Sequence, residues 1–262
     1  MDLNLQHKNA VICGSTQGIG LATAREMAAQ GATVTLVARN EKKLKQTLGE
    51  LAVTNRQQHS YIMADFNHPE ELREKIEKYS RENPPVHILV NNSGGPPGGP
   101  LTEARYEEFE LTFNRHLQCN HIMVQALVPG MKSNQYGRII NVISTSVKQP
   151  IPGLGVSNTI RGAVANWAKT LAGELAPFHI TVNNVLPGAT LTDRLNSIIQ
   201  NKADKTGKTY EEIREKMLKE IPARRFASAE EIADAIVFLA SPSAGYINGI
   251  NVPVDGGRTS CL

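Results

Sequence analysis

Short apolar runs alternate with longer amphipathic segments along the whole chain. The apolar runs are typical of buried strands, and they lie at 9–13, 33–38, 60–64, 86–90, 138–143, 180–186 and 250–254. The segments between them repeat apolar residues at helical spacing, which predicts helices over 18–30, 41–52, 69–81, 103–131, 158–176, 195–219 and 229–240. Such alternation predicts a parallel sheet that helices cover on both faces.

The alternation runs through all 262 residues without a repeat or a low-complexity tract. We therefore expect one α/β domain over residues 1–262 with a doubly wound parallel sheet. In such a sheet the crossovers are right-handed, and ligands bind beyond the carboxyl ends of the strands. The turns that follow the strands are thus the places where chemistry is expected.

Composition and charge exclude several classes of protein. The net charge is only +3 and the 28 basic residues are scattered, so we expect no nucleic-acid partner. No run approaches the roughly 18 apolar residues of a membrane span. The three cysteines form no metal or disulfide framework, so we expect no metal, and they suit a reducing cytoplasm.

The first strand leads into a glycine-rich turn and then a helix. Glycines at this junction let the backbone approach a pyrophosphate, which meets the positive end of the helix. The alternative is a turn that needs glycine only for steric reasons. The position of the turn favours a dinucleotide site, formed by Gly14, Ser15, Thr16, Gln17, Gly18, Ile19 and Gly20.

The ends of the next two strands bear on the identity of the cofactor. Arg39 and Asn40 follow the second strand, where an acidic residue would bind the ribose of NAD. Since arginine suits the extra phosphate of NADP, we expect NADP(H) rather than NAD, the alternative being that Arg39 is only a surface residue. Asp65, followed by Phe66, could accept a hydrogen bond from the adenine, or serve only as a turn residue or helix cap.

Five motifs in order resemble those of the short-chain dehydrogenase/reductase family: GSTQGIG, NNSG, NVISTS, NNVLPGATLTD and NVPVDGG. The C-terminal part is most similar to the 3-oxoacyl-acyl-carrier-protein reductase branch. The resemblance implies a Rossmann-type domain of about seven parallel strands, a nicotinamide cofactor and a homotetramer or homodimer. It also implies cofactor contacts from Gly14, Ser15, Gly18, Ile19, Gly20, Asp65, Asn92, Ser93, Gly94, Pro187, Gly188 and Thr192.

The family's catalytic residues are only partly present. Ser144 matches the serine that polarises a carbonyl group. The tyrosine position is Ser157, the lysine position is Arg161 and the relay asparagine position is His116. A serine hydroxyl is a far weaker acid than a phenol, whereas Arg161 can still hold the ribose. The usual Tyr and Lys chemistry is therefore not expected.

Two side chains are candidates for supplying the missing proton. His116 has the ordinary pKa of a physiological acid, but it could instead merely fill the asparagine site. Lys148 lies on the loop after Ser144 and could bind the substrate or donate a proton, or be an exposed loop residue.

Three functions remain open. The first is an NADP(H)-dependent oxidoreductase acting on a small carbonyl or alcohol substrate, with residues 190–222 as a substrate lid. The second is a cofactor-binding sensor or assembly protein without turnover. The third is a lyase or isomerase on the same scaffold.

Overall fold

Seven parallel strands form one sheet in the order β3-β2-β1-β4-β5-β6-β7. The computed structural model describes residues 1–261, so Leu262, the last residue of the expected domain, lies outside the described residues. The strands are β1 (Asn9–Cys13), β2 (Thr33–Ala38), β3 (Ser60–Met63), β4 (Ile88–Asn91), β5 (Gly137–Val142), β6 (Ile180–Pro187) and β7 (Asn251–Val254). The order reverses beside β1, which confirms the predicted doubly wound, Rossmann-type sheet.

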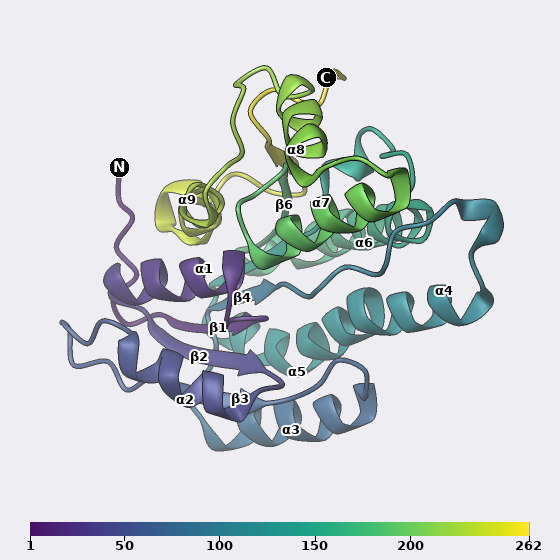
Figure 1. Cartoon of the computed structure of the whole chain (residues 1–262). Helices are drawn as coiled ribbons and strands as arrows, with labels where there is room; N and C mark the ends of the chain where they lie inside the picture. The colour runs from purple at the N-terminus through teal and green to yellow at the C-terminus, as the bar shows by residue number, and fades with distance from the viewer. Residues whose placement is uncertain (262) are drawn as a thin grey trace.

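Two helical layers enclose the sheet, and each buries its apolar side against one face. One layer contains α1 (Gly18–Ala29), α2 (Glu41–Glu50) and α9 (Ala229–Ala240). The other contains α3 (Pro69–Glu82), α5 (Cys119–Ser133) and α6 (Gly155–Leu175). Figure 1 shows α1 and α9 on one side of the sheet and α3 and α5 on the other. All turns that follow the strands therefore open at one edge between the layers.

The segment 103–131 is not the single helix that its periodicity predicts. It consists of a 3-10 turn η1 (Leu101–Glu103), the helix α4 (Tyr106–Phe113), a π-helical turn η2 (Asn114–Gln118) and α5. A π turn adds a residue to the helical repeat, so it shifts the side chains that follow it. Such turns occur often at functional sites, and this one contains His116.

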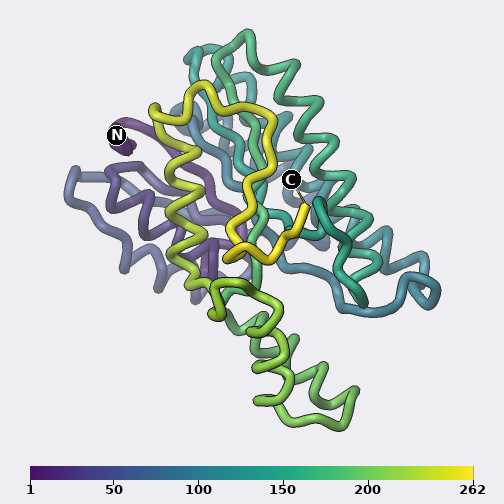
Figure 2. The backbone as a smooth tube through the Cα atoms, turned by 90° about the horizontal axis from the view of Figure 1, so that it is seen from above, coloured from purple at the N-terminus to yellow at the C-terminus, as the bar shows by residue number. Residues whose placement is uncertain are grey.

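The expected lid forms a lobe of two helices rather than one. α7 (Asp193–Thr206) ends at Gly207, whose φ of 67° requires the left-handed conformation, and α8 (Tyr210–Lys219) follows. The lobe has its own small core, which includes Leu195, Ile199 and Ile213. Figure 2 shows that this lobe projects from the body of the molecule. It packs mainly on itself, which is the arrangement expected of an element able to move.

A chain of buried asparagine amides crosses four neighbouring strands. Asn91 donates to Asn141 at 2.9 Å, Asn141 donates to Asn184 at 2.9 Å, and Asn184 donates to Asn251 at 2.8 Å. Each pair consists of directly opposed residues in the sheet. Since a one-residue slip of any of these strands would break one or two of the three bonds, this chain favours the observed register next to the carboxyl ends of the strands.

Candidate functional site

The turn between β1 and α1 needs its glycines for close packing. A Cβ atom on Gly20 would lie 2.2 Å from the carbonyl oxygen of Gly14, which no side chain can tolerate. Gly14 and Gly18 have positive φ values of 60° and 53°. The turn therefore leads directly into the amino terminus of α1, whose free N–H groups can meet an anion.

Two residues from distant segments lie against this turn. The amide of Asn92 donates to the carbonyl oxygens of Cys13 and Gly14 at 3.3 and 3.4 Å. A Cβ on Gly18 would lie 3.0 Å from Cγ2 of Thr192, which caps α7 by accepting from the N–H of Leu195. The structure thus brings the predicted residues of the first turn, the β4 end and the lid together.

The ends of β2 and β3 contain the candidate residues for the adenosine part of a dinucleotide. Arg39 is exposed and forms no ion pair within residues 1–261. Asn40 caps α2 by accepting from the N–H of Lys43 at 3.0 Å, so its side-chain oxygen is already used. Asp65 is half-buried and accepts from the N–H of Asn67, and Phe66 packs against the core.

The β6 end supplies Pro187 and Gly188, which the motif resemblance predicts at the nicotinamide end. Pro187 is the last residue of β6, and the N–H of Gly188 donates to Val254 on β7 at 2.9 Å. A Cβ on Gly188 would lie 2.7 Å from Cα of Asp255. Glycine is therefore required here for close approach of two chain segments.

His116 is 3% exposed and lies in the π turn. Its Nδ1 atom is hydrogen-bonded to the hydroxyl of Ser93 at 2.8 Å, and its Nε2 atom has no partner within residues 1–261. Burial, followed by the charges of Arg161 and Arg115, lowers the pKa of His116 well below its usual value. The imidazole is neutral at physiological pH, so the expectation that it titrates near neutrality does not hold.

Ser144 and the first two turns of α6 supply the residues at the expected catalytic positions. Ser144 is half-buried, and its hydroxyl accepts from the N–H of Ser146 at 3.1 Å. Ser157 and Arg161 follow one another at helical spacing and are 9% and 7% exposed. The Ser157 hydroxyl forms no hydrogen bond with another group of residues 1–261, so it remains available to a bound molecule.

Arg161 is the most deeply buried cation of this region. Its Nη1 atom donates to the carbonyl oxygen of Val142, at the end of β5, at 3.0 Å. Burial, and then the charge of Arg194, lowers the pKa of Arg161 to about 10. The guanidinium group therefore remains charged at neutral pH and has no carboxylate partner within the described chain.

Lys148 lies on the loop between β5 and α6, where the C-terminal segment passes. Its ammonium group has no hydrogen-bond partner within residues 1–261, and its carbonyl oxygen accepts from Sγ of Cys261 at 3.5 Å. The neighbouring Gln149 accepts from the N–H and hydroxyl of Ser260 at 3.2 and 3.1 Å. Figure 2 also shows the C-terminus beside this loop. Sequence reasoning did not predict this contact.

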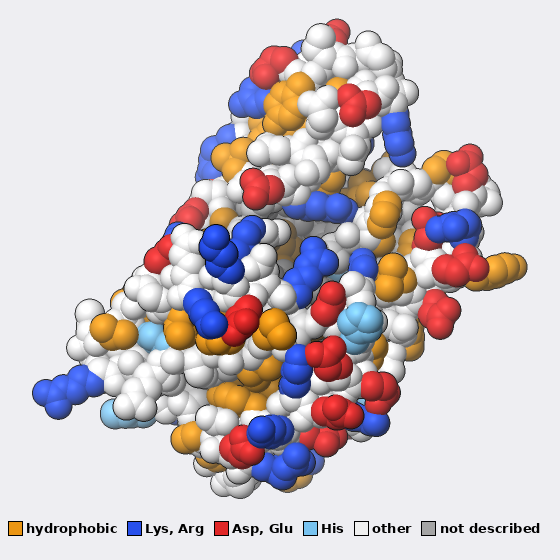
Figure 3. Space-filling view, turned by 60° about the horizontal axis from the view of Figure 1, so that its bottom comes forward, with side chains coloured by type: hydrophobic (Ala, Val, Ile, Leu, Met, Phe, Trp, Pro, Cys, Tyr) orange, Lys and Arg blue, Asp and Glu red, His pale blue; other side chains and the backbone are white. Residues whose placement is uncertain are grey.

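Arg194, in the first turn of α7, is a further residue of the site that the sequence analysis did not single out. Its Nη2 atom donates to the carbonyl oxygen of Pro96 at 2.7 Å, which connects the lid to the loop after β4. Its only signal in the sequence is its position two residues after Thr192 in the TLTD motif. Basic side chains border the hollow in the face seen in Figure 3.

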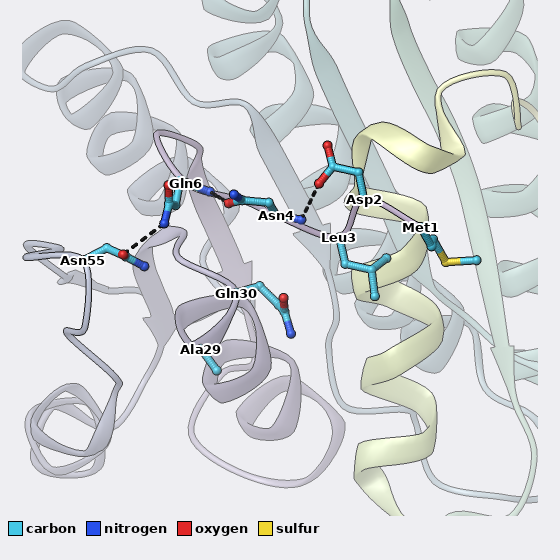
Figure 4. Close-up of a pocket in the computed structure, with 8 residues that line it drawn as sticks. All are labelled: Met1, Asp2, Leu3, Asn4, Gln6, Ala29, Gln30 and Asn55. Carbon is cyan, nitrogen blue, oxygen red and sulfur yellow. Dashed lines mark hydrogen bonds between the residues drawn. The ribbon is translucent and has the colours of Figure 1, made fainter.

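A shallow hollow of about 450 Å³ lies elsewhere, around the amino-terminal segment. Figure 4 shows its lining, which comes from residues 1–4, Gln6, the end of α1 and Asn55. These segments lie at the amino ends of the strands, opposite the edge that holds the residues above. The hollow contains none of the candidate catalytic residues, so we attach no chemistry to it.

Known proteins resemble this chain over nearly its whole length. A family model described as Enoyl-(Acyl carrier protein) reductase matches residues 14–259. The 3-oxoacyl-[acyl-carrier-protein] reductase FabG of Rickettsia conorii is 32% identical, over 97% of this chain and 98% of that protein. The NADPH-dependent reductase BacG of Bacillus subtilis is 28% identical, over 98% of this chain and 100% of that protein.

A solved structure agrees with these matches. The crystal structure of L-sorbose reductase from Gluconobacter frateurii, complexed with NADPH and L-sorbose, has a TM-score of 0.93 and 32% identity, with both chains covered completely. The fold is thus that of a Rossmann-type oxidoreductase. The chain belongs to the short-chain dehydrogenase/reductase family, which confirms the resemblance seen in its motifs.

Two features are absent from residues 1–261. No helix there is both long and apolar enough to cross a membrane. No group of three or more His, Cys, Asp or Glu side chains there is arranged to hold a metal ion.

Proposed function

We propose that this protein is an NADP(H)-dependent oxidoreductase that acts on a small carbonyl or alcohol substrate, as the 3-oxoacyl-carrier-protein reductases do. One observation carries the proposal: the glycine turn, Asn92 and Thr192 pack together, and the unpaired Arg39 lies at the neighbouring strand end. The turn leaves space for a pyrophosphate only because its glycines lack Cβ atoms. The NADPH named for BacG and for L-sorbose reductase supports the same cofactor.

Each side chain of the site has a different role in the proposed reaction. Bound NADPH supplies the hydride. Ser144 polarises the substrate carbonyl, and Arg161 donates to the ribose beside the nicotinamide. Since neutral His116 is a poor acid and Ser157 is a weak one, the proton comes from Lys148 or from water. Ser157 and His116 then act as hydrogen-bonding groups.

The surroundings of the site complete the proposal. Residues 190–222 close over the substrate as a lid, since α7 and α8 have a small core of their own. The three free thiols fit a cytoplasmic protein. A homotetramer or homodimer is part of the proposal, although burial of α6 against Ile143 and Leu186 in one subunit already accounts for much of its apolar character.

The replacements at positions 157 and 161 favour one second candidate, a nucleotide-binding sensor without turnover. Calorimetry with NADPH and NADH, followed by NADPH oxidation with a panel of ketones, sugars and 3-oxoacyl thioesters, separates the two. We expect tighter binding of NADPH and turnover of at least one carbonyl compound. Binding without turnover on the whole panel would leave the sensor; absence of binding would contradict both.

A further inference from the structure

Two guanidinium groups border the same small space beside the loop after β4. A Cβ atom placed on Gly95 would lie 3.7 Å from Nη2 of Arg161 and 3.6 Å from Nη2 of Arg194. Arg161 comes from α6 and Arg194 from α7, so the body and the lid each contribute one cation. Gly95, which lies between them, has no side chain that could fill this space.

Neither cation is neutralised by the protein. Within residues 1–261, neither guanidinium group forms an ion pair. Each makes one hydrogen bond to a carbonyl oxygen, Arg161 to Val142 and Arg194 to Pro96, which orients the group and leaves other N–H donors free. Arg161 is buried and Arg194 is exposed. A buried charge beside a like charge is costly, so an anion bound between the two would relieve the repulsion that Arg161 feels.

The cofactor does not account for both charges. Its pyrophosphate belongs at the turn 14–20 and its 2′-phosphate at Arg39, by the function proposed above. The ribose next to the nicotinamide carries hydroxyl groups but no charge, and the family's single lysine serves it. Arg194 is therefore an additional cation at the substrate end of the site.

We propose that Arg194, together with an N–H donor of Arg161 that the ribose does not use, binds the carboxylate of a small oxo acid or hydroxy acid substrate. The proposal rests on the proposed function and names its substrate class. The planar fork of arginine matches the two oxygens of a carboxylate, and two forks can hold it from two sides. Arg161 is bonded to Val142, at the end of the strand that leads into Ser144, so the anion would be held at the same strand end as the group proposed to polarise the carbonyl.

The contact between Arg194 and Pro96 gives the carboxylate a second role. Arg194 reaches the loop after β4 from the first turn of α7. An anion that binds both arginines therefore links the lid to α6 and favours the closed position. A neutral ketone provides no such link.

Binding of an unreactive probe tests this proposal without turnover. The full-length protein, saturated with NADP⁺, is titrated in a calorimeter with oxamate and with its neutral counterpart oxamide. We expect oxamate to bind at least about ten-fold more tightly, because charged hydrogen bonds are the strong ones. Arg194→Gln removes this preference and Arg194→Lys keeps part of it. Arg214→Gln, a lid variant whose arginine already pairs with Glu211, leaves the preference unchanged.

Three results would overturn the proposal: equal binding of oxamate and oxamide, an unaffected preference in Arg194→Gln, or tighter binding of inorganic phosphate than of oxamate. The proposed function fails separately, when no carbonyl compound oxidises NADPH. Where turnover is found, Arg194→Gln lowers kcat/KM for pyruvate at least ten-fold and leaves kcat/KM for its methyl ester within two-fold.

Discussion

The Nδ1 atom of His116 and the hydroxyl oxygen of Ser93 lie 2.8 Å apart. This hydrogen bond joins the loop after β4 to the π turn between α4 and α5, which are the two segments expected to hold the ribose and to relay the proton. A ribose bound at Ser93, as the motif resemblance implies, would share its hydroxyl with the imidazole. Cofactor binding would then be coupled to the state of His116.

The buried histidine predicts a loss of stability in mild acid. The pKa of His116 is lower in the folded protein than in the unfolded chain. At a pH between these two pKa values, the unfolded chain therefore binds a proton that the folded protein does not bind. Stability is then unaffected above the unfolded pKa, and it falls as the pH drops below about 6.5, by at most about 1.4 kcal/mol per pH unit for one group. We expect His116→Asn to flatten this decline.

Thermal unfolding between pH 7.5 and pH 5 measures the effect. His68→Gln, a change at an exposed histidine, is the control and keeps the slope of the parent protein. His87, whose pKa burial also lowers, adds a smaller decline that both variants retain. An unchanged slope in His116→Asn would show that His116 does not control the acid sensitivity.

The asparagine chain predicts unequal effects along the sheet. Asn141→Ala leaves the amide of Asn91 and the carbonyl of Asn184 without partners in the core, at a cost of roughly 2–5 kcal/mol. Asn251→Ala removes one bond at the half-buried end and costs about 1 kcal/mol. Urea unfolding with an unchanged m-value checks this order. Equal losses would mean that the chain does not act as a connected network.

The sequence predicted best those helices and strands whose bounds follow from the spacing of their apolar residues. The strands 9–13 and 33–38 and the helix 229–240 have the predicted bounds, and the capping box of Ser228 and Glu231 is present. The burial pattern and the caps of these elements depend only on residues that are close in the sequence, so the sequence alone can predict them.

The sequence could not show how distant residues meet. The π turn depends on one extra residue in a helix whose period looks continuous, and the asparagine chain needs the register of four strands. The Arg161 and Arg194 pair joins segments 33 positions apart through Gly95. Each is a tertiary relationship without a local signal.

The contact between Gly20 and Gly14 predicts a sharp steric effect. Gly20→Ala places a methyl group 2.2 Å from a carbonyl oxygen, so the turn must open. We expect the Kd for NADPH to rise at least about ten-fold and the Tm to fall. Gly173→Ala is the matched control, because Gly173 lies on the exposed surface of α6 and a Cβ there would have no neighbour within 4 Å. This variant should leave NADPH binding unchanged and raise the free energy of unfolding by about 0.5–1 kcal/mol. An unchanged Kd for NADPH in Gly20→Ala would show that the turn is not part of the cofactor site.

The position of Arg39 predicts the cofactor preference. A charged hydrogen bond to phosphate contributes about 1.5–3 kcal/mol, which corresponds to roughly 10–100-fold in affinity. Arg39→Asp should therefore weaken NADPH binding by that factor and leave NADH binding equal or stronger. Arg73→Asp, the same charge change on the exposed face of α3, alters neither. Calorimetry with both cofactors decides, and an unchanged preference in Arg39→Asp would contradict the assignment to NADP(H).

The buried Ser157 allows a direct test of what the site lacks. Its hydroxyl lies one helical turn before Arg161, so a tyrosine there would extend from the same helix face as Arg161. We expect Ser157→Tyr combined with Arg161→Lys to raise kcat for neutral ketones by roughly 10²–10⁴, the usual contribution of a positioned acid. Ser157→Phe with Arg161→Lys fills the same space without a hydroxyl, so it separates proton transfer from packing. If kcat rose equally in both double variants, the improvement would come from filling the space. If kcat rose in neither variant while NADPH still bound, proton delivery would not be the step that limits this protein.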